Sequence, residues 1–168
     1  NANFVKKVIF PVEMVVVAEF VATLFYFAVG MAIFVPLMFV HYGTLPWTAL
    51  AAPFVAAPLF MMTLGIGWFV ASLGVYLRDI GQVVPIVVTV MMFLSPIFFP
   101  IEALPEGVRG WVALNPVTWA VEHLRGVFFL GRLPGALGTA AQYALGLATM
   151  WLGWAWFQKT KRGFADVL

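Results

Sequence analysis

The sequence predicts an all-α protein that crosses a membrane several times. Of its 168 residues, 64% are apolar and only 10% are charged, whereas soluble domains carry roughly 25% charged residues. The charges gather at the two ends of the chain, near residue 78 and between residues 102 and 132, and long apolar stretches separate these clusters. Such a composition excludes a disordered chain and argues against a soluble domain, because too few polar side chains are present to cover its surface.

Four apolar stretches are predicted to be membrane spans, at residues 14–40, 49–77, 83–99 and 136–157. The first would be about 40 Å long as a helix, so it must tilt or kink at Pro36 to fit a hydrocarbon core of roughly 30 Å. Two prolines lie in the first third of the second stretch, and we expect regular helix there only from about Leu59. In the third stretch, Pro85 suits the first turn of a helix, where a missing N–H costs nothing.

The segment 101–135 is predicted to be an external region that does not cross the membrane. Asn115 and Pro116 form a favourable helix start, with asparagine as N-cap and proline at the first helical position. A helix from there to about Leu130 would be about 22 Å long, which is too short for a bilayer. We therefore expect an interfacial or re-entrant helix that packs against protein or a water-filled cavity.

The positions of lysine and arginine predict the orientation, because short cytoplasmic segments are enriched in both residues. With both ends of the chain in the cytoplasm, six of the nine cations lie inside, namely Lys6, Lys7, Arg78, Lys159, Lys161 and Arg162. The other three lie in the external segment, which also carries three glutamates. The whole chain, residues 1–168, is then one multi-pass membrane domain.

Small residues recur at helical spacing in two of the predicted spans. They are Gly67, Ala71 and Gly74 in the second span, and Gly146, Thr149 and Gly153, preceded by Gln142, in the fourth. Such faces let helix backbones approach closely. We interpret them as packing surfaces within the chain, and a subunit interface is the alternative.

The sequence offers little support for a self-contained enzyme. It has no cysteine, two histidines 82 positions apart, no G-x-x-x-x-G-K-[ST] phosphate loop and no G-x-S-x-G elbow. We therefore predict no catalytic residue and no metal site, and a net charge of +2 gives no basic surface for nucleic acid. Glu19 is the one ionisable side chain well inside a span, and we expect it to face protein, water or a pore.

Five segments, in order, resemble a known family. They are residues 1–11, the sequence LGVYLRDIGQ at 73–82, FLSPIFFP at 93–100, LNPVT at 114–118 and FQKTKRGFADVL at 157–168. Together they are similar to the membrane subunit of bacterial ABC exporters of polysaccharide and polyol phosphate, which include exporters of O-antigen, capsule and teichoic acid. The family has six transmembrane helices after an amphipathic helix, so the resemblance implies that the four spans are the third to sixth.

The resemblance also implies partners and roles. A separate ABC ATPase would bind ATP and Mg, so no cofactor is expected in this chain, and two permease copies would carry a lipid-linked glycan across the bacterial inner membrane. Residues expected to couple to the ATPase are Lys6, Lys7, Tyr76, Arg78, Asp79 and Gln82. Residues expected to line the channel or meet the substrate are Glu19, Phe98, Phe99, Trp111, Trp119, Glu122 and Arg125.

Three other functions stay open at this point. The first is an ABC exporter of drugs or small lipids. The second is an intramembrane transferase, with Glu19, Glu122 and His123 as its acids and base. The third is a structural or channel protein without catalytic activity.

Overall fold

A computed structural model describes residues 13–164 and contains helices and turns, with no strand among these residues. The α-helices are α2 (Glu13–Tyr42), α3 (Ala52–Tyr76), α4 (Ile80–Phe93), α5 (Glu106–Ala113), α6 (Pro116–Phe129) and α7 (Ala136–Thr160). Three short 3-10 helices join them: η1 (Trp47–Ala51), η2 (Ile101–Ala103) and η3 (Lys161–Gly163). The all-α prediction is therefore confirmed for the described residues.

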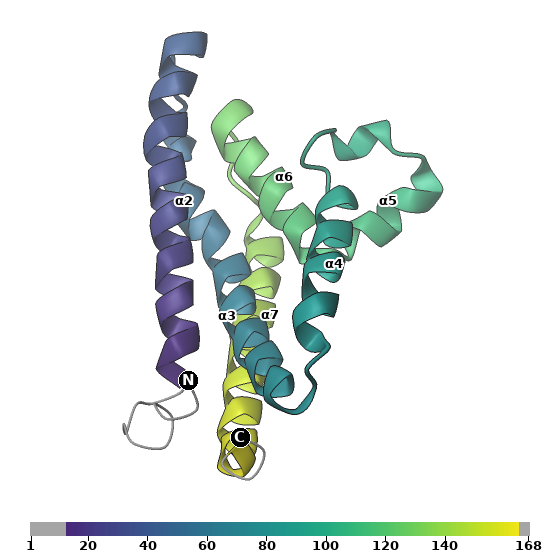
Figure 1. Cartoon of the computed structure of the whole chain (residues 1–168). Helices are drawn as coiled ribbons and strands as arrows, with labels where there is room; N and C mark the ends of the chain where they lie inside the picture. Colours follow the sequence, from purple (N-terminus) through teal and green to yellow (C-terminus); the bar gives the residue numbers. More distant parts are fainter. Residues whose placement is uncertain (1–12, 165–168) are drawn as a thin grey trace.

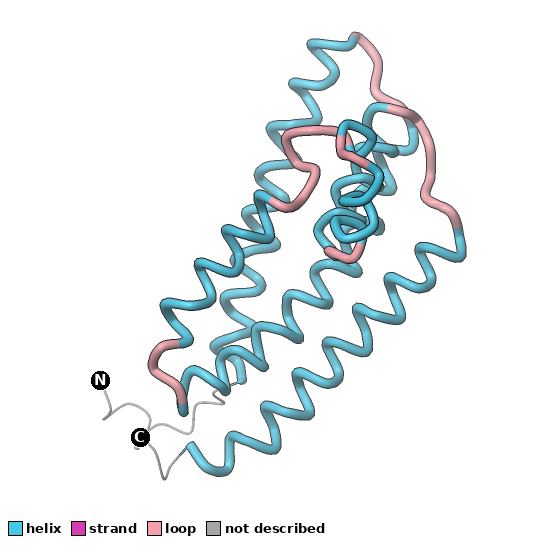
Figure 2. The backbone as a smooth tube through the Cα atoms, turned by 90° about the vertical axis from the view of Figure 1, so that its right-hand side faces the viewer, coloured by secondary structure: helices cyan, strands magenta, loops and turns pink. Residues whose placement is uncertain are grey.

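The helices form a bundle in which α3 and α7 run side by side in the same direction (Figure 1). Helix α2 flanks this pair on one side, α4 and α5 lie on the other, and α6 rises across the upper part of the bundle. The tube view shows the same long helices from the side, with α5 and α6 packed at the end remote from Glu13 and Phe164 (Figure 2). Both ends of the described chain therefore lie at one end of the bundle.

Two helical segments are long and apolar enough to cross a membrane, Glu13–Tyr42 and Trp47–Tyr76. They agree with the first two predicted spans, and α2 continues through Pro36. Helix α7 has the length, since its 25 residues would reach about 37 Å, but its composition does not meet the same criterion. The structure therefore supports two of the four predicted spans.

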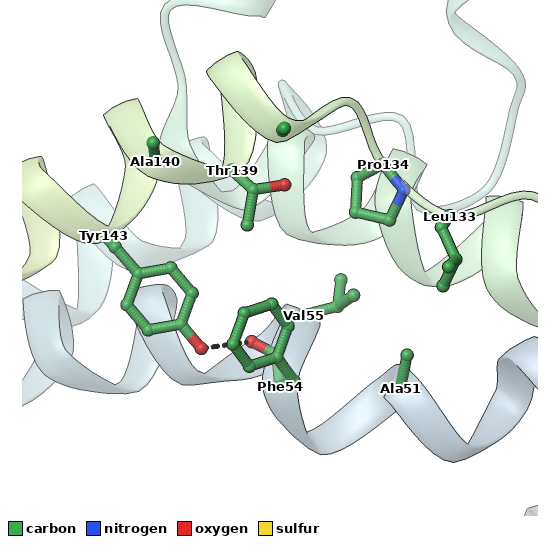
Figure 3. Close-up of a pocket in the computed structure, with 9 residues that line it drawn as sticks. Ala51, Phe54, Val55, Leu133, Pro134, Thr139, Ala140 and Tyr143 are labelled. Atoms are coloured by element: carbon green, nitrogen blue, oxygen red, sulfur yellow. Dashed lines mark hydrogen bonds between the residues drawn. The ribbon is translucent and has the colours of Figure 1, made fainter.

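Helix α3 begins earlier than the sequence predicts. It starts at Ala52, with Pro53 in its first turn, and it continues through Pro58. Proline has no N–H, so it leaves the carbonyl of Phe54 without its usual helical donor. The Tyr143 hydroxyl of α7 donates to that carbonyl at 2.8 Å (Figure 3). The expectation of regular helix only from Leu59 was wrong: α3 passes through Pro58, and another helix supplies the missing donor.

Helix α4 is also displaced from its prediction. The predicted span was 83–99, whereas the helix covers Ile80–Phe93, so Pro85 lies inside the helix and not in its first turn as predicted. Its 14 residues reach about 21 Å, less than a hydrocarbon core of roughly 30 Å. Just after the helix ends, the hydroxyl of Ser95 donates a hydrogen bond to the carbonyl of Met91 at 2.6 Å. Ser95 immediately precedes Pro96. None of the residues of α4 is buried in the bundle.

Glycines allow the backbones of α3 and α7 to touch. A Cβ atom on Gly153 would lie 2.6 Å from the carbonyl carbon of Gly65, and one on Gly146 would lie 2.8 Å from the carbonyl oxygen of Pro58. The face predicted in the fourth span is therefore a packing surface within the chain. The face predicted in the second span does not pack against α7. Gly67 approaches Val16 of α2 instead, and a Cβ on Gly74 would meet nothing within 4 Å.

Candidate functional site

The start of α6 is fixed by Asn115, as the sequence predicts. The Asn115 side chain accepts a hydrogen bond from the N–H of Val117 at 3.0 Å and so caps the helix. Its amide nitrogen donates to the hydroxyl of Ser95 at 2.8 Å and to the carbonyl of Met91 at 3.2 Å. One side chain therefore caps α6 and joins it to the end of α4.

The middle of α6 carries most of its polar side chains. Arg125 forms an ion pair with Glu122, one turn earlier, and donates to the carbonyl of Pro96 at 2.9 Å. On another side of the helix, the Gln142 amide of α7 donates to Nδ1 of His123 at 3.1 Å. These contacts join α6 to the segment after α4 and to α7.

The other end of α6 is held by the segment before α3. The hydroxyl of Thr48, in η1, donates to the carbonyl of Val127 at 2.6 Å, and both residues are buried. Gly131 has a φ of +60°, which suits glycine, and the chain turns there so that the N–H of Arg132 binds the carbonyl of Gly126 at 3.0 Å. Helix α6 is thus anchored at its start, middle and end.

The segment before α6 contains a second short helix, α5, which the sequence prediction missed. Arg109 of α5 donates through Nε to the carbonyl of Leu104 at 2.7 Å and through Nη2 to that of Glu102 at 2.6 Å. These bonds close the loop between η2 and α5. The chain turns between α5 and α6 beside α4, so the two helices form a short hairpin at this end of the bundle (Figure 1).

The predicted channel residues do not form one cluster. Phe98 and Trp111 are exposed, at 74% and 76%, whereas Phe99 and Trp119 are half-buried. Glu19 lies exposed on α2, less than two turns from the end that carries Glu13. Glu122 and Arg125 are the predicted pair that the structure brings together. Within the described residues, histidines and carboxylates do not gather in groups of three that could hold a metal ion.

The predicted coupling residues that the structure describes lie at the opposite end. Arg78 and Asp79 form the exposed turn between α3 and α4, and Gln82 is exposed in the first turn of α4. The hydroxyl of Tyr76 donates to the carbonyl of Thr160 at 2.9 Å, so its polar atom faces α7. Lys6 and Lys7 lie outside the described residues.

A polar cluster at this end of the bundle was not predicted from the sequence. Lys161 pairs with Glu13 at 3.1 Å, and the indole N–H of Trp68 donates to the carbonyl of Glu13 at 3.4 Å. These bonds join the beginning of α2, α3 and η3, the short helix that directly follows α7. Glu13 and Lys161 are 148 positions apart, so no local pattern could pair them.

An apolar cavity of about 580 Å³ lies between the first half of α3 and the beginning of α7 (Figure 3). Phe54 and Tyr143 form one wall, with ring centroids 5.0 Å apart, and Leu133 and Pro134 lie at the opposite side. The hydroxyl of Tyr143 is already engaged with α3. The cavity therefore suits hydrocarbon and offers no acid–base chemistry.

Comparison with known proteins agrees with this architecture. The ABC-2 type transporter family matches residues 1–129. The chain is 26% identical over 170 residues to the O-antigen export system permease protein RfbA of Myxococcus xanthus, covering 98% of this chain and 64% of that protein. Two proteins of the same name from Klebsiella pneumoniae are each 25% identical over 171 residues, covering all of this chain and 65% of their own length.

The chain thus spans about 64–65% of the length of the curated relatives that it matches. The family match covers more than three quarters of the chain and includes α2, α3, the exposed turn, α4, α5 and α6. The chain belongs to the ABC-2 type transporter family of membrane proteins.

Proposed function

We propose that this chain is part of the membrane subunit of an ATP-driven exporter that moves a lipid-linked polysaccharide or polyol phosphate across the bacterial inner membrane. The observation that carries the proposal is the family match, together with relatives named O-antigen export permeases that align with 98–100% of the chain. The role is transport, and a separate ABC ATPase supplies the energy. The absence of a phosphate loop from the sequence is consistent with this division of labour.

The end of the bundle that carries Glu13 and Phe164 would face the cytoplasm and the ATPase. Arg78 and Asp79 are suited to docking because they are exposed, adjacent and opposite in charge. The cluster formed by Glu13, Trp68 and Lys161 lies at the same end and joins α2, α3 and η3. A displacement of the turn would therefore act first on α3 and α4, which it joins, and reach α7 through the bond from Tyr76 to Thr160.

The hairpin of α5 and α6 would lie at the external end and narrow the exit of the channel. Helix α6 is too short to cross a bilayer, and its 14 residues are joined to α4, η1 and α7. Helix α4, with no buried residue, leaves an apolar surface for lipid or for a second copy of the subunit. A homodimer with the channel between two copies is consistent with that surface.

The docking role is tested by exchanging the charges of the turn, in the variant Arg78→Glu with Asp79→Lys. We expect less ATPase to co-purify with the permease, while the melting temperature of the permease itself is unchanged, because both side chains are exposed. Arg132→Glu, which changes an exposed cation at the other end, is the matched control. Normal co-purification of the charge-exchanged variant would show that the turn is not the docking site.

The class of cargo is tested at the aromatic residues of the external end. Phe98, Phe99 and Trp119 are replaced by alanine, and export of the glycan to the cell surface is measured. We expect export to fall, because aromatic faces stack on the apolar faces of sugar rings. Unchanged glycan export in all three variants would count against sugar stacking at the exit and in favour of another cargo.

A further inference from the structure

A groove lies between α2 and α6; it contains Arg125, one of the predicted channel residues, and none of the aromatic residues assigned to the exit. Its volume is about 260 Å³. All but one of the lining side chains are apolar. The apolar ones are Met31, Phe34, Ile97, Val121, Leu124, Phe128 and Phe129, and the remaining one is Arg125. The exception, Arg125, gives an otherwise apolar groove one positive charge.

Arg125 is held in place and keeps hydrogen-bonding capacity. One N–H of Nη1 donates to the carboxylate of Glu122, and one N–H of Nη2 donates to the carbonyl of Pro96. A guanidinium has five N–H donors, so Nε–H and one N–H on each Nη have no partner among the described residues. The Arg125 side chain is 28% exposed. The guanidinium is therefore oriented and still accessible to an anion.

The depth of the groove indicates where that anion would come from. Met31 and Phe34 lie about 27 and 32 Å of helical rise beyond Glu13, and a hydrocarbon core is about 30 Å thick. Because α2 is longer than the core and tilts to fit it, this rise places the groove in the part of the core that adjoins the opposite boundary. Lipid phosphates lie at that boundary, and acyl chains lie immediately below it. A guanidinium recognises a phosphate through several parallel hydrogen bonds.

We propose that this groove binds an anionic phospholipid of the bilayer, with its phosphate on Arg125 and an acyl chain along the apolar walls formed by α2 and α6. The bound lipid would stabilise α6 against α2 from the membrane side. Glu122 would oppose binding, since its carboxylate competes with the phosphate for the same guanidinium. The proposal does not depend on the cargo, because it concerns a lipid of the surrounding bilayer.

The opposite effects of the two charges give the test. The full-length protein is purified free of lipid, and binding of phosphatidylglycerol and phosphatidylcholine is titrated by native mass spectrometry. We expect phosphatidylglycerol to bind more tightly than phosphatidylcholine, Arg125→Gln to weaken it roughly tenfold, and Glu122→Gln to strengthen it. Arg132→Gln, an exposed cation outside the groove, should leave it unchanged.

Several results would overturn the proposal. Equal affinity for the two lipids in the unmodified protein would exclude recognition of net charge. Inorganic phosphate that binds as tightly as phosphatidylglycerol would mean that the apolar walls contribute nothing. If Arg125→Gln does not fold, Glu122→Gln decides alone: tighter binding supports the site, and unchanged or weaker binding means that the ion pair only orients α6.

Discussion

Replacing Tyr143 by phenylalanine removes one hydroxyl and preserves the aromatic contact with Phe54, whose ring centroid is 5.0 Å away. That hydroxyl is the donor to the carbonyl of Phe54, which Pro58 deprives of its helical partner. The substitution would leave a carbonyl oxygen unsatisfied beside an apolar cavity. The loss of stability in this variant should therefore come from the lost hydrogen bond and not from lost packing.

Two estimates bound the size of the effect. A buried acceptor without a donor costs about 1–3 kcal/mol in soluble proteins, whereas hydrogen bonds between membrane helices contribute about 0.6 kcal/mol on average and at most about 1.7. The cavity wall is apolar and the bond joins two helices of the bundle, so we expect a loss of about 1 kcal/mol in the free energy of unfolding. For a chain of this size, that corresponds to a fall of about 2–4 °C in melting temperature.

A double-mutant cycle separates this mechanism from a general weakening of the contact. Pro58→Ala restores an N–H at position 58, which can donate to the carbonyl of Phe54 within α3. Tyr143→Phe should then cost less in the Pro58→Ala background than in the unmodified protein, as measured by unfolding in mixed micelles. An equal cost in both backgrounds would refute the reasoning. Tyr26→Phe is the control, because Tyr26 is 73% exposed on α2.

Three further predictions concern the packing of α7 against α3 and the anchoring of α6. Gly153→Ala should destabilise the bundle by several kcal/mol, because the new Cβ would meet the backbone of α3. Gly138→Ala, in the same helix but with open space around it, should be neutral or stabilise the protein by at most about 1 kcal/mol. The melting temperatures of the two variants compare them directly. Asn115→Asp keeps the helix cap but removes both N–H donors to the end of α4, so it should fall between the wild type and Asn115→Ala, which we expect to lose about 1–2 kcal/mol. Thr48→Val should cost about 1–3 kcal/mol by leaving the carbonyl at the end of α6 without its donor, and faster hydrogen exchange in the last turn of α6 would identify the cause, whereas unchanged exchange there would exclude it.

The sequence by itself determined the class of protein and those elements whose signals are local. Apolar length was enough to place α2, because a segment that long and apolar predicts a membrane-spanning helix. The start of α6 was equally predictable, since Asn115 and Pro116 act within one turn of the residues that they cap. The exposed turn at Arg78 and Asp79 followed from two adjacent charges between apolar stretches.

Only the tertiary structure decided the features that depend on a distant partner. Helix α3 continues through Pro58, and its missing donor comes from Tyr143, 89 positions beyond the carbonyl that needs it. Helix α4 ends at Phe93, and its last turn is joined to the start of α6 because the Asn115 amide donates to the carbonyl of Met91. In both cases a side chain on one helix binds a backbone carbonyl of another, and partners that lie 89 and 24 positions apart leave no local pattern in the sequence.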